Sequence, residues 1–94
     1  MGELKGEVMK SREKLGQLFK NARLKQGASQ FGLAQSIGRN TSFISRVESG
    51  EKLPSYATLR ALIKELKVIS HELVPIWLAV EEERIMGCME RIAG

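Results

Sequence analysis

Two short helical patterns joined by a tight turn occupy residues 29–50, and they constrain the fold more than any other part of the chain. Gly38 suits the turn between them, and Gly50 suits the end of the second pattern. The second pattern begins with small polar side chains rather than apolar ones. A polar first turn that follows another short helix is typical of proteins that place a helix in the DNA major groove.

Helix signals recur along the rest of the chain. Five residues can cap the starts of helices, namely Ser11, Ser29, Asn40, Ser55 and Ser70. Apolar residues follow them at helical spacing, namely Leu15, Leu18, Phe19, Ala22, Leu33, Ala34, Ile37, Ile44, Val47, Leu59, Leu62, Ile63 and Leu66. Gly27 is placed to end the first helix, and Pro75 is expected in the first turn of the last one. With no strand pattern or repeat, the sequence predicts an all-α fold.

The same signals divide the chain into three segments. Residues 1–10 lack periodicity and are expected to form a flexible N-terminal arm. Residues 11–69 are expected to form a compact four-helix domain, and residues 70–94 a C-terminal helix. The chain length of 94 residues allows one small domain, which commonly gains stability by pairing with a copy of itself.

The C-terminal helix has two apolar sides. One side carries Ile76, Trp77 and Val80, which are expected to dock on the helices before it. Roughly opposite, four apolar residues recur at i, i+7, i+11 and i+14, namely Leu78, Ile85, Met89 and Ile92. This second side either lies back on its own domain or forms a dimer seam. We favour the dimer seam, because Ile76, Trp77 and Val80 already provide the side that docks on the domain.

Charge is distributed unevenly. Residues 1–69 hold thirteen basic and six acidic side chains, whereas residues 70–94 hold two basic and five acidic ones, for a net charge of +4. The first part can therefore face a polyanion such as DNA. The run Glu81-Glu82-Glu83 is expected to be a solvated face, with pairing to Arg84 as the alternative.

Several classes of protein are disfavoured. Cys88 is the one cysteine, so no intramolecular disulfide forms and a reducing cytoplasm is expected. The longest apolar run, residues 73–80, is too short to span a membrane, and the N-terminus does not resemble a secretory signal. His71 has no second histidine or nearby cysteine, and no phosphate loop or nucleophile–base pair occurs. We therefore expect no metal, no cofactor and no enzymatic activity.

Residues 12–68 resemble the Cro/C1-type helix-turn-helix family, also called XRE or lambda-repressor-like. The matching residues run through four helices without a gap, namely Leu15, Gly16, Arg23, Ser29, Gln30, Leu33, Ala34, Gly38, Ile44, Ser45, Val47, Glu48, Gly50, Pro54, Ser55, Leu59 and Leu66. The resemblance implies a lambda-repressor-like domain that binds double-stranded DNA.

The resemblance also implies roles for individual residues. Gln30 matches a glutamine that contacts a DNA phosphate, and Arg23 and Glu48 match a pair that forms a structural salt bridge. Five residues match positions that face the groove or its flanking backbone, namely Asn40, Thr41, Ser42, Ser45 and Arg46. Asn40 could instead be only a helix cap, and the others an ordinary polar face.

Three positions depart from the family pattern. Gly32 occupies a helix position where the family usually has a charged residue, and a glycine there costs the helix about 1 kcal/mol relative to alanine. Arg39 stands where a small apolar residue is common, so it either adds a phosphate contact or alters the turn. Phe31 is unusually apolar and is expected to be exposed near the DNA or a partner.

Two functions fit these expectations. The first is a sequence-specific transcriptional regulator that binds a pseudo-palindromic operator as a homodimer. The alternative is an antitoxin-type protein that binds a protein partner through its C-terminal helix and autoregulates its operon. The first is the leading hypothesis, because nothing in the sequence identifies a toxin partner.

Overall fold

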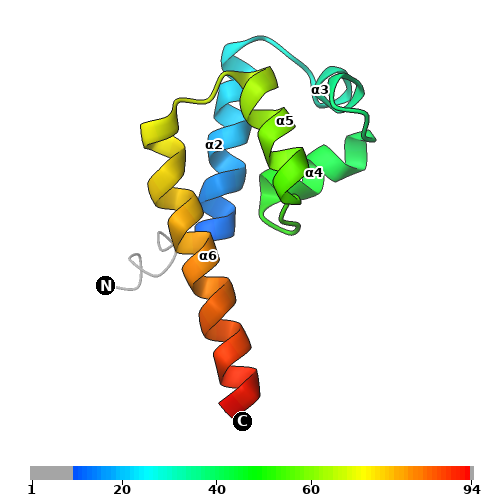
Figure 1. Ribbon diagram of the computed structural model, residues 1–94. Helices are drawn as coiled ribbons and strands as arrows, with labels where there is room; N and C mark the ends of the chain where they lie inside the picture. The colour runs from blue at the N-terminus through cyan, green and yellow to red at the C-terminus, as the bar shows by residue number, and fades with distance from the viewer. Residues whose placement is uncertain (1–9, 94) are drawn as a thin grey trace, which may run out of the picture.

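The computed structural model describes residues 10–93 and, within them, the side chains of residues 10–69 and 71–87. This part of the chain forms helices and no strands (Figure 1), which confirms the predicted all-α fold. The helices, with the labels of Figure 1, are α2 (Ser11–Lys25), α3 (Gln30–Ser36), α4 (Thr41–Ser49), α5 (Tyr56–Leu66) and α6 (Ser70–Ala93).

Three predicted caps close the helix starts as expected. The side-chain oxygens of Ser29, Asn40 and Ser55 accept hydrogen bonds from the N–H groups of Gly32, Phe43 and Thr58. Each bond satisfies one of the donors that the first turn of a helix leaves free.

The predicted cap at Ser11 is wrong by one residue. Lys10 takes the N-cap position of α2, and its N–H donates to Glu13 Oε1 at 3.1 Å. The Ser11 hydroxyl is buried and instead donates to Glu83 Oε2, at 2.6 Å. This bond links the first residue of α2 to α6, so the serine serves packing between helices rather than the helix end.

Two glycines let α2 approach the end of α4. A Cβ atom at Gly16 would collide with the backbone carbonyl oxygens of Val47 and Glu48. Gly50 ends α4 with φ at 85°, in the left-handed region, and a Cβ atom there would meet the backbone of Glu13. Only glycine combines this backbone angle with so close an approach, which fixes α4 against α2.

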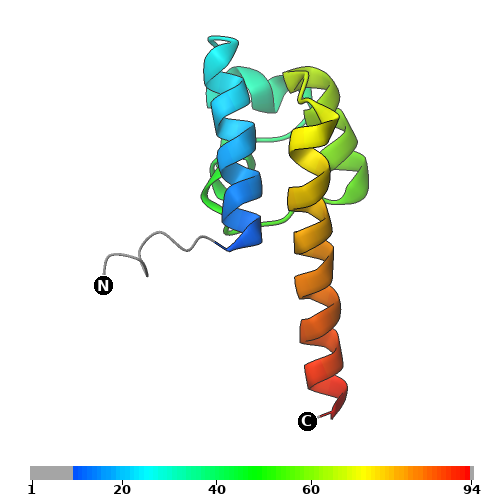
Figure 2. The same ribbon diagram turned by 90° about the vertical axis from the view of Figure 1, so that its left-hand side faces the viewer.

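The core forms around α2, which packs against α4, α5 and α6, while α3 packs on α4. Figure 2 shows α2 and α6 side by side and antiparallel. The buried apolar residues of this core are Leu15, Phe19, Leu33, Ala34, Phe43, Ile44, Val47, Leu59, Leu62, Leu66 and Leu73. Phe43 and Leu73 were not among the predicted core residues. Phe43 widens the apolar stripe of α4 by one position, since it lies one turn before Val47.

The start of α6 differs from the prediction. Two N–H groups, of Glu72 and Leu73, donate to the Ile69 carbonyl, so the helix is established before Pro75 is reached. Pro75 therefore lies inside the helix, in its second turn rather than its first. Its ring removes one backbone donor from the helix interior. Pro75 itself is exposed.

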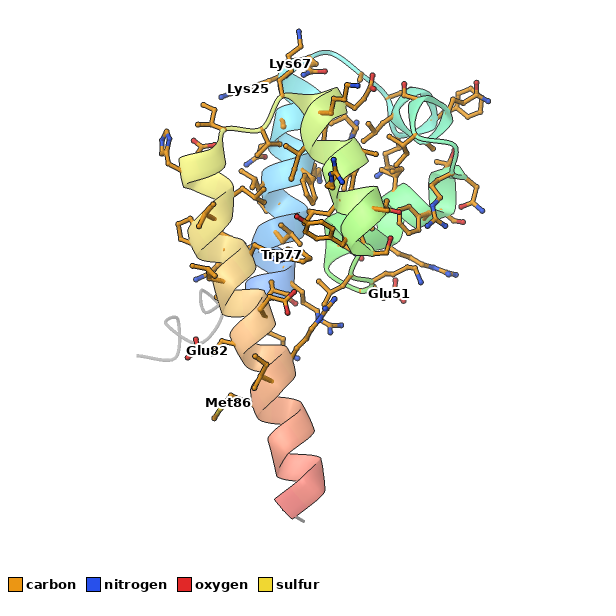
Figure 3. All side chains as sticks on the ribbon, viewed as in Figure 1. Lys25, Glu51, Lys67, Trp77, Glu82 and Met86 are labelled. Carbon is orange, nitrogen blue, oxygen red and sulfur yellow. The ribbon has the colours of Figure 1, made fainter. Side chains whose placement is uncertain are left out.

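The two predicted sides of α6 are both present. Leu73 and Val80 are buried, and Ile76 and Trp77 are half-buried against the core. Figure 3 shows Trp77 between α6 and the other helices, and Met86 on the side of α6 away from them.

Three apolar residues on the opposite side of α6 form what we call the outer stripe, namely Val74, Leu78 and Ile85. Their exposed fractions are 50%, 62% and 57%. The stripe begins one turn earlier than predicted, at Val74. The side chains of Met89 and Ile92, which were assigned to the same seam, lie outside the described residues. The helix continues well beyond the start of α2 (Figures 1 and 2), so its second half projects from the body.

Candidate nucleic-acid interface

The nine-residue helix α4 separates its side chains into two classes. Phe43, Ile44, Val47 and Glu48 are buried. The reading face, as we call it, consists of Thr41, Ser42, Ser45 and Arg46, all of which are exposed. These four lie on one side because they stand at i, i+1, i+4 and i+5. The reading face thus presents three hydroxyls and one guanidinium to solvent.

Asn40 organises the start of the reading face. Its Oδ1 accepts the N–H of Phe43 at 2.9 Å and the hydroxyl of Ser42 at 3.0 Å. The Ser42 hydroxyl proton is therefore engaged, while its lone pairs remain open to a donor. The amide NH₂ of Asn40 also remains open. The structure thus shows Asn40 as a cap whose donors can still contact a ligand.

An ion pair fixes the far end of α4. Arg23 Nε lies 2.7 Å from Glu48 Oε2, Arg23 Nη2 donates to Glu48 Oε1 at 3.1 Å, and both residues are buried. Arg23 Nη1 also donates to the Ala28 carbonyl, at 2.9 Å. The structure therefore brings the expected pair together in a two-bond arrangement that links α2 to the end of α4. Such a fork restrains angle as well as distance.

Gln30 joins this ion pair. Its Nε2 donates to Glu48 Oε1 at 2.9 Å, and the residue is half-buried at the first position of α3. A side-chain amide has two N–H donors, so one remains for a phosphate. No local sequence signal predicts the bond to Glu48, since the two residues are eighteen positions apart. The phosphate contact assigned to Gln30 stays a prediction.

Arg39 lies in the turn between α3 and α4 rather than on the reading face. Its guanidinium carbon lies 4.5 Å from the centroid of the Phe43 ring, and Nη2 donates to Thr58 Oγ1 at 3.2 Å. The side chain thus spans from the turn to the first turn of α5. Thr58 was not among the predicted site residues, because no sequence pattern places α5 beside this turn.

The surface around the reading face carries no exposed carboxylate from its own helices. Residues 14–47 contain no Asp or Glu, and Glu48 is buried in its ion pair. Arg39 and Arg46 are exposed in the same region, and within the described residues no carboxylate pairs with either. Phe31, in the first turn of α3, is 62% exposed, as the sequence suggested. A polyanion approaching α3 and α4 therefore meets positive charge from Arg39 and Arg46, and the nearest exposed carboxylate in sequence is Glu51, just after α4.

The shape of α4 suits a groove of DNA. An α-helix with its side chains is about 10–12 Å across, and the major groove of B-DNA is about 12 Å wide. Hydroxyls, amides and a guanidinium are the groups that hydrogen-bond to base edges and phosphates. The geometry and chemistry of the reading face therefore match this ligand.

The acidic run on α6 is divided between partners. Glu81 Oε2 lies 3.4 Å from Arg84 Nη1, and Glu83 accepts the Ser11 hydroxyl, whereas Glu82 is exposed. The described residues contain no cluster of three or more His, Cys, Asp or Glu side chains that could hold a metal ion. No helix in the same part of the chain is both long and apolar enough to cross a membrane.

Comparisons with known proteins agree with this architecture. A family model described as a helix-turn-helix domain matches residues 14–75, about two thirds of the chain. Among solved structures, the chain is similar to the clp gene regulator ClgR from Corynebacterium glutamicum, with a TM-score of 0.64 and 22% sequence identity. That alignment covers 88% of this chain and 86% of the other, and at this identity it shows a shared fold. No curated protein matches the sequence.

Proposed function

Because the chain belongs to the helix-turn-helix domain family, we propose that it is a sequence-specific, double-stranded DNA-binding transcriptional regulator of the Cro/C1 type. It acts as a homodimer on a pseudo-palindromic operator, in the cytoplasm and without enzymatic activity. The family match supports the coarser part of this proposal, DNA binding in transcription regulation. The finer parts are supported by the residues of α4 and α6.

The observation that carries the proposal is the reading face of α4. Four polar side chains are exposed on a helix whose opposite side is entirely buried. A solvated polar face alone would be ordinary. Here it is flanked by the capped start at Asn40 and the ion-paired end at Glu48, so the helix is held in one orientation. A rigid polar helix at the surface is suited to specific contacts with base edges.

The contacting groups divide by chemistry. Thr41, Ser42, Ser45 and Arg46 contact base edges in the major groove, which sets specificity. Gln30, Arg39 and the free backbone N–H groups at the start of α3 contact phosphates, which sets affinity and register. This division predicts that affinity depends on salt while base preference depends on the reading face.

The outer stripe of α6 supports dimer formation. Its three described residues are all at least half exposed, although each is large and apolar. A second copy presents the same stripe, so a two-fold interface can cover both at once. A homodimer places two α4 helices in successive major grooves, with half-sites about 34–36 Å apart. An operator for such a dimer has two-fold symmetry.

The first test is a fluorescence-anisotropy titration with DNA from upstream of the protein's own gene and with a scrambled duplex, at two salt concentrations. We expect tight binding to the upstream DNA that survives added salt better than binding to the scrambled duplex. Specific affinity exceeds nonspecific affinity by about 10³-fold or more in proteins of this kind. Equal binding to both duplexes, erased by salt, would contradict the proposal for this DNA.

A variant of the reading face tests how specificity arises. Arg46→Ala is expected to relax base preference at one position of each half-site by about 1–3 kcal/mol, because an arginine can form two hydrogen bonds with guanine. The measurement compares the affinities of a set of single-base operator variants for the wild type and Arg46→Ala. An equal loss on every sequence would show that Arg46 contacts only phosphate.

A further inference from the structure

Arg39 is held on two sides by side chains of its own chain, Phe43 and Thr58. Phe43 supports one side of its guanidinium, with 4.5 Å between the guanidinium carbon and the ring centroid. Thr58 Oγ1 accepts from its Nη2 at 3.2 Å. Both supports are themselves fixed. Phe43 is only 7% exposed within the core, and Thr58 Oγ1 accepts the Ser55 hydroxyl at 3.1 Å.

The arrangement leaves most of the guanidinium free to bind an anion. Arginine has five N–H donors, and the bond to Thr58 uses one of them. Arg39 is exposed, and no carboxylate among the described residues pairs with it. Its charge is therefore available at a fixed place on the surface, beside the first turn of α5.

The position of the guanidinium favours a phosphate over a base as the ligand. The guanidinium contacts the ring of Phe43, which belongs to the buried side of α4. It does not lie among the four side chains of the reading face. A contact made from the edge of the helix meets the DNA backbone that borders the groove, which carries the same charge in every sequence.

On this basis, and resting on the proposed function, we infer that Phe43 and Thr58 are positioning residues for DNA binding. They hold Arg39 in the pose that contacts one phosphate in each half-site, although neither touches the DNA. Ordering a long side chain at an interface costs affinity, and a side chain that is ordered beforehand avoids that cost. The hydroxyl of Thr58 thus contributes to affinity through Arg39.

The test uses Thr58→Val, which keeps the shape of the side chain and removes its hydroxyl, with Thr58→Ser as the matched control that keeps the hydroxyl. Affinity for the upstream and scrambled duplexes is measured by anisotropy across a salt series. We expect Thr58→Val to weaken binding to both duplexes by about three- to tenfold, the range expected for ordering one side chain. The salt dependence should stay that of the wild type, because no charge is lost. Thr58→Ser should bind like the wild type.

Arg39→Ala and the double variant complete the design. Arg39→Ala should weaken binding to both duplexes and reduce the slope of log affinity against log salt by about 0.9 per protomer, the value for one phosphate contact. Arg60→Ala, which removes an exposed charge from the same helix α5, should leave the slope unchanged. The double variant Arg39→Ala/Thr58→Val should bind no more weakly than Arg39→Ala alone, because Thr58 acts through Arg39.

Three results would overturn the inference while leaving the proposed function intact. The first is wild-type affinity in Thr58→Val. The second is an additive loss in the double variant, and the third is an unchanged salt slope in Arg39→Ala. Failure of the proposed function would be seen separately, as a wild-type protein that does not distinguish the two duplexes. Circular dichroism melting of each variant checks that the helices remain folded.

Discussion

α4 and α6 each have one buried and one exposed side, but their exposed sides call for different ligands. The exposed side of α4 is polar, and the helix is fixed at both ends by Asn40 and by the pair of Arg23 and Glu48. The exposed side of α6 carries the apolar outer stripe, with Glu82 beside it, and the second half of the helix projects from the body. The comparison teaches that two properties of a helix indicate its kind of ligand. They are the polarity of its exposed side and the rigidity with which the helix is attached to the rest of the domain.

The free energy of exposure to water also differs between the reading face and the outer stripe. Hydroxyls and a guanidinium are well solvated, so the reading face costs little in water and can exchange water for base edges. Burying a large aliphatic side chain contributes about 1.5–3 kcal/mol. The outer stripe therefore favours association, since covering Val74, Leu78 and Ile85 on two copies removes from water the exposed half or more of six such side chains.

The largest effect is expected from introducing a charge into the outer stripe of α6. Leu78→Glu should weaken self-association by about 3–6 kcal/mol, because each of two copies loses a buried leucine. Sedimentation equilibrium measures the change, and Glu72→Lys is the control. Glu72 is exposed and lies about 120° around the helix from Leu78, outside the outer stripe.

Two outcomes would contradict this prediction. A Leu78→Glu protein that remains as dimeric as the wild type would place the interface elsewhere. A wild type that stays monomeric alone, but binds the product of a neighbouring gene through residues 74–85, would favour the antitoxin-type alternative.

A somewhat smaller effect is expected from releasing the fixed end of α4. Glu48→Ala should lower the free energy of unfolding by about 3–5 kcal/mol, because it leaves the buried Arg23 guanidinium without its carboxylate. Urea unfolding measures the change. Glu51→Ala, three residues away and exposed, is the control and should stay within about 0.5 kcal/mol of the wild type. Equal stabilities of the two variants would mean that the ion pair contributes nothing to holding α4.

The smallest effect concerns glycine, and it sharpens the comparison between the two helices. Gly16→Ala should destabilise the fold by about 1–3 kcal/mol, because the new methyl group collides with backbone carbonyls at the end of α4. Gly87→Ala should instead be neutral or stabilising by up to about 1 kcal/mol, since no atom lies within 4 Å of the added carbon in α6. Thermal unfolding of both variants measures this difference of sign. Two losses of similar size would show that the close approach at Gly16 is not the cause.

The fold was predictable because its signals are local. Caps at Ser29, Asn40 and Ser55, and apolar residues at helical spacing, act within one or two turns of the chain, and the structure confirms them. The two errors arose where another interaction overrides such a local signal. Ser11 resembles a cap by residue type, and Pro75 usually stands in a first turn, but packing and the Ile69 carbonyl place the helix starts elsewhere.

The candidate site was predictable only in part. The polar side chains of α4 and the pairing of Arg23 with Glu48 came from the resemblance to a known family. The bonds from Gln30 to Glu48 and from Arg39 to Thr58 join residues eighteen and nineteen positions apart. No spacing rule reports such contacts, because they depend on how the helices pack.

The hydrogen bond between Ser11 and Glu83 has a consequence for the dimer and the operator that we propose. It holds the beginning of the projecting half of α6 against the start of α2, and α2 in turn packs against α4. A dimer joined through α6 would therefore be rigid, with a fixed distance and a fixed relative rotation between its two reading faces. One inserted base pair moves a half-site by about 3.4 Å and turns it by about 35°. A rigid dimer of this kind would therefore discriminate between operators by the spacing of their half-sites as well as by their base sequence.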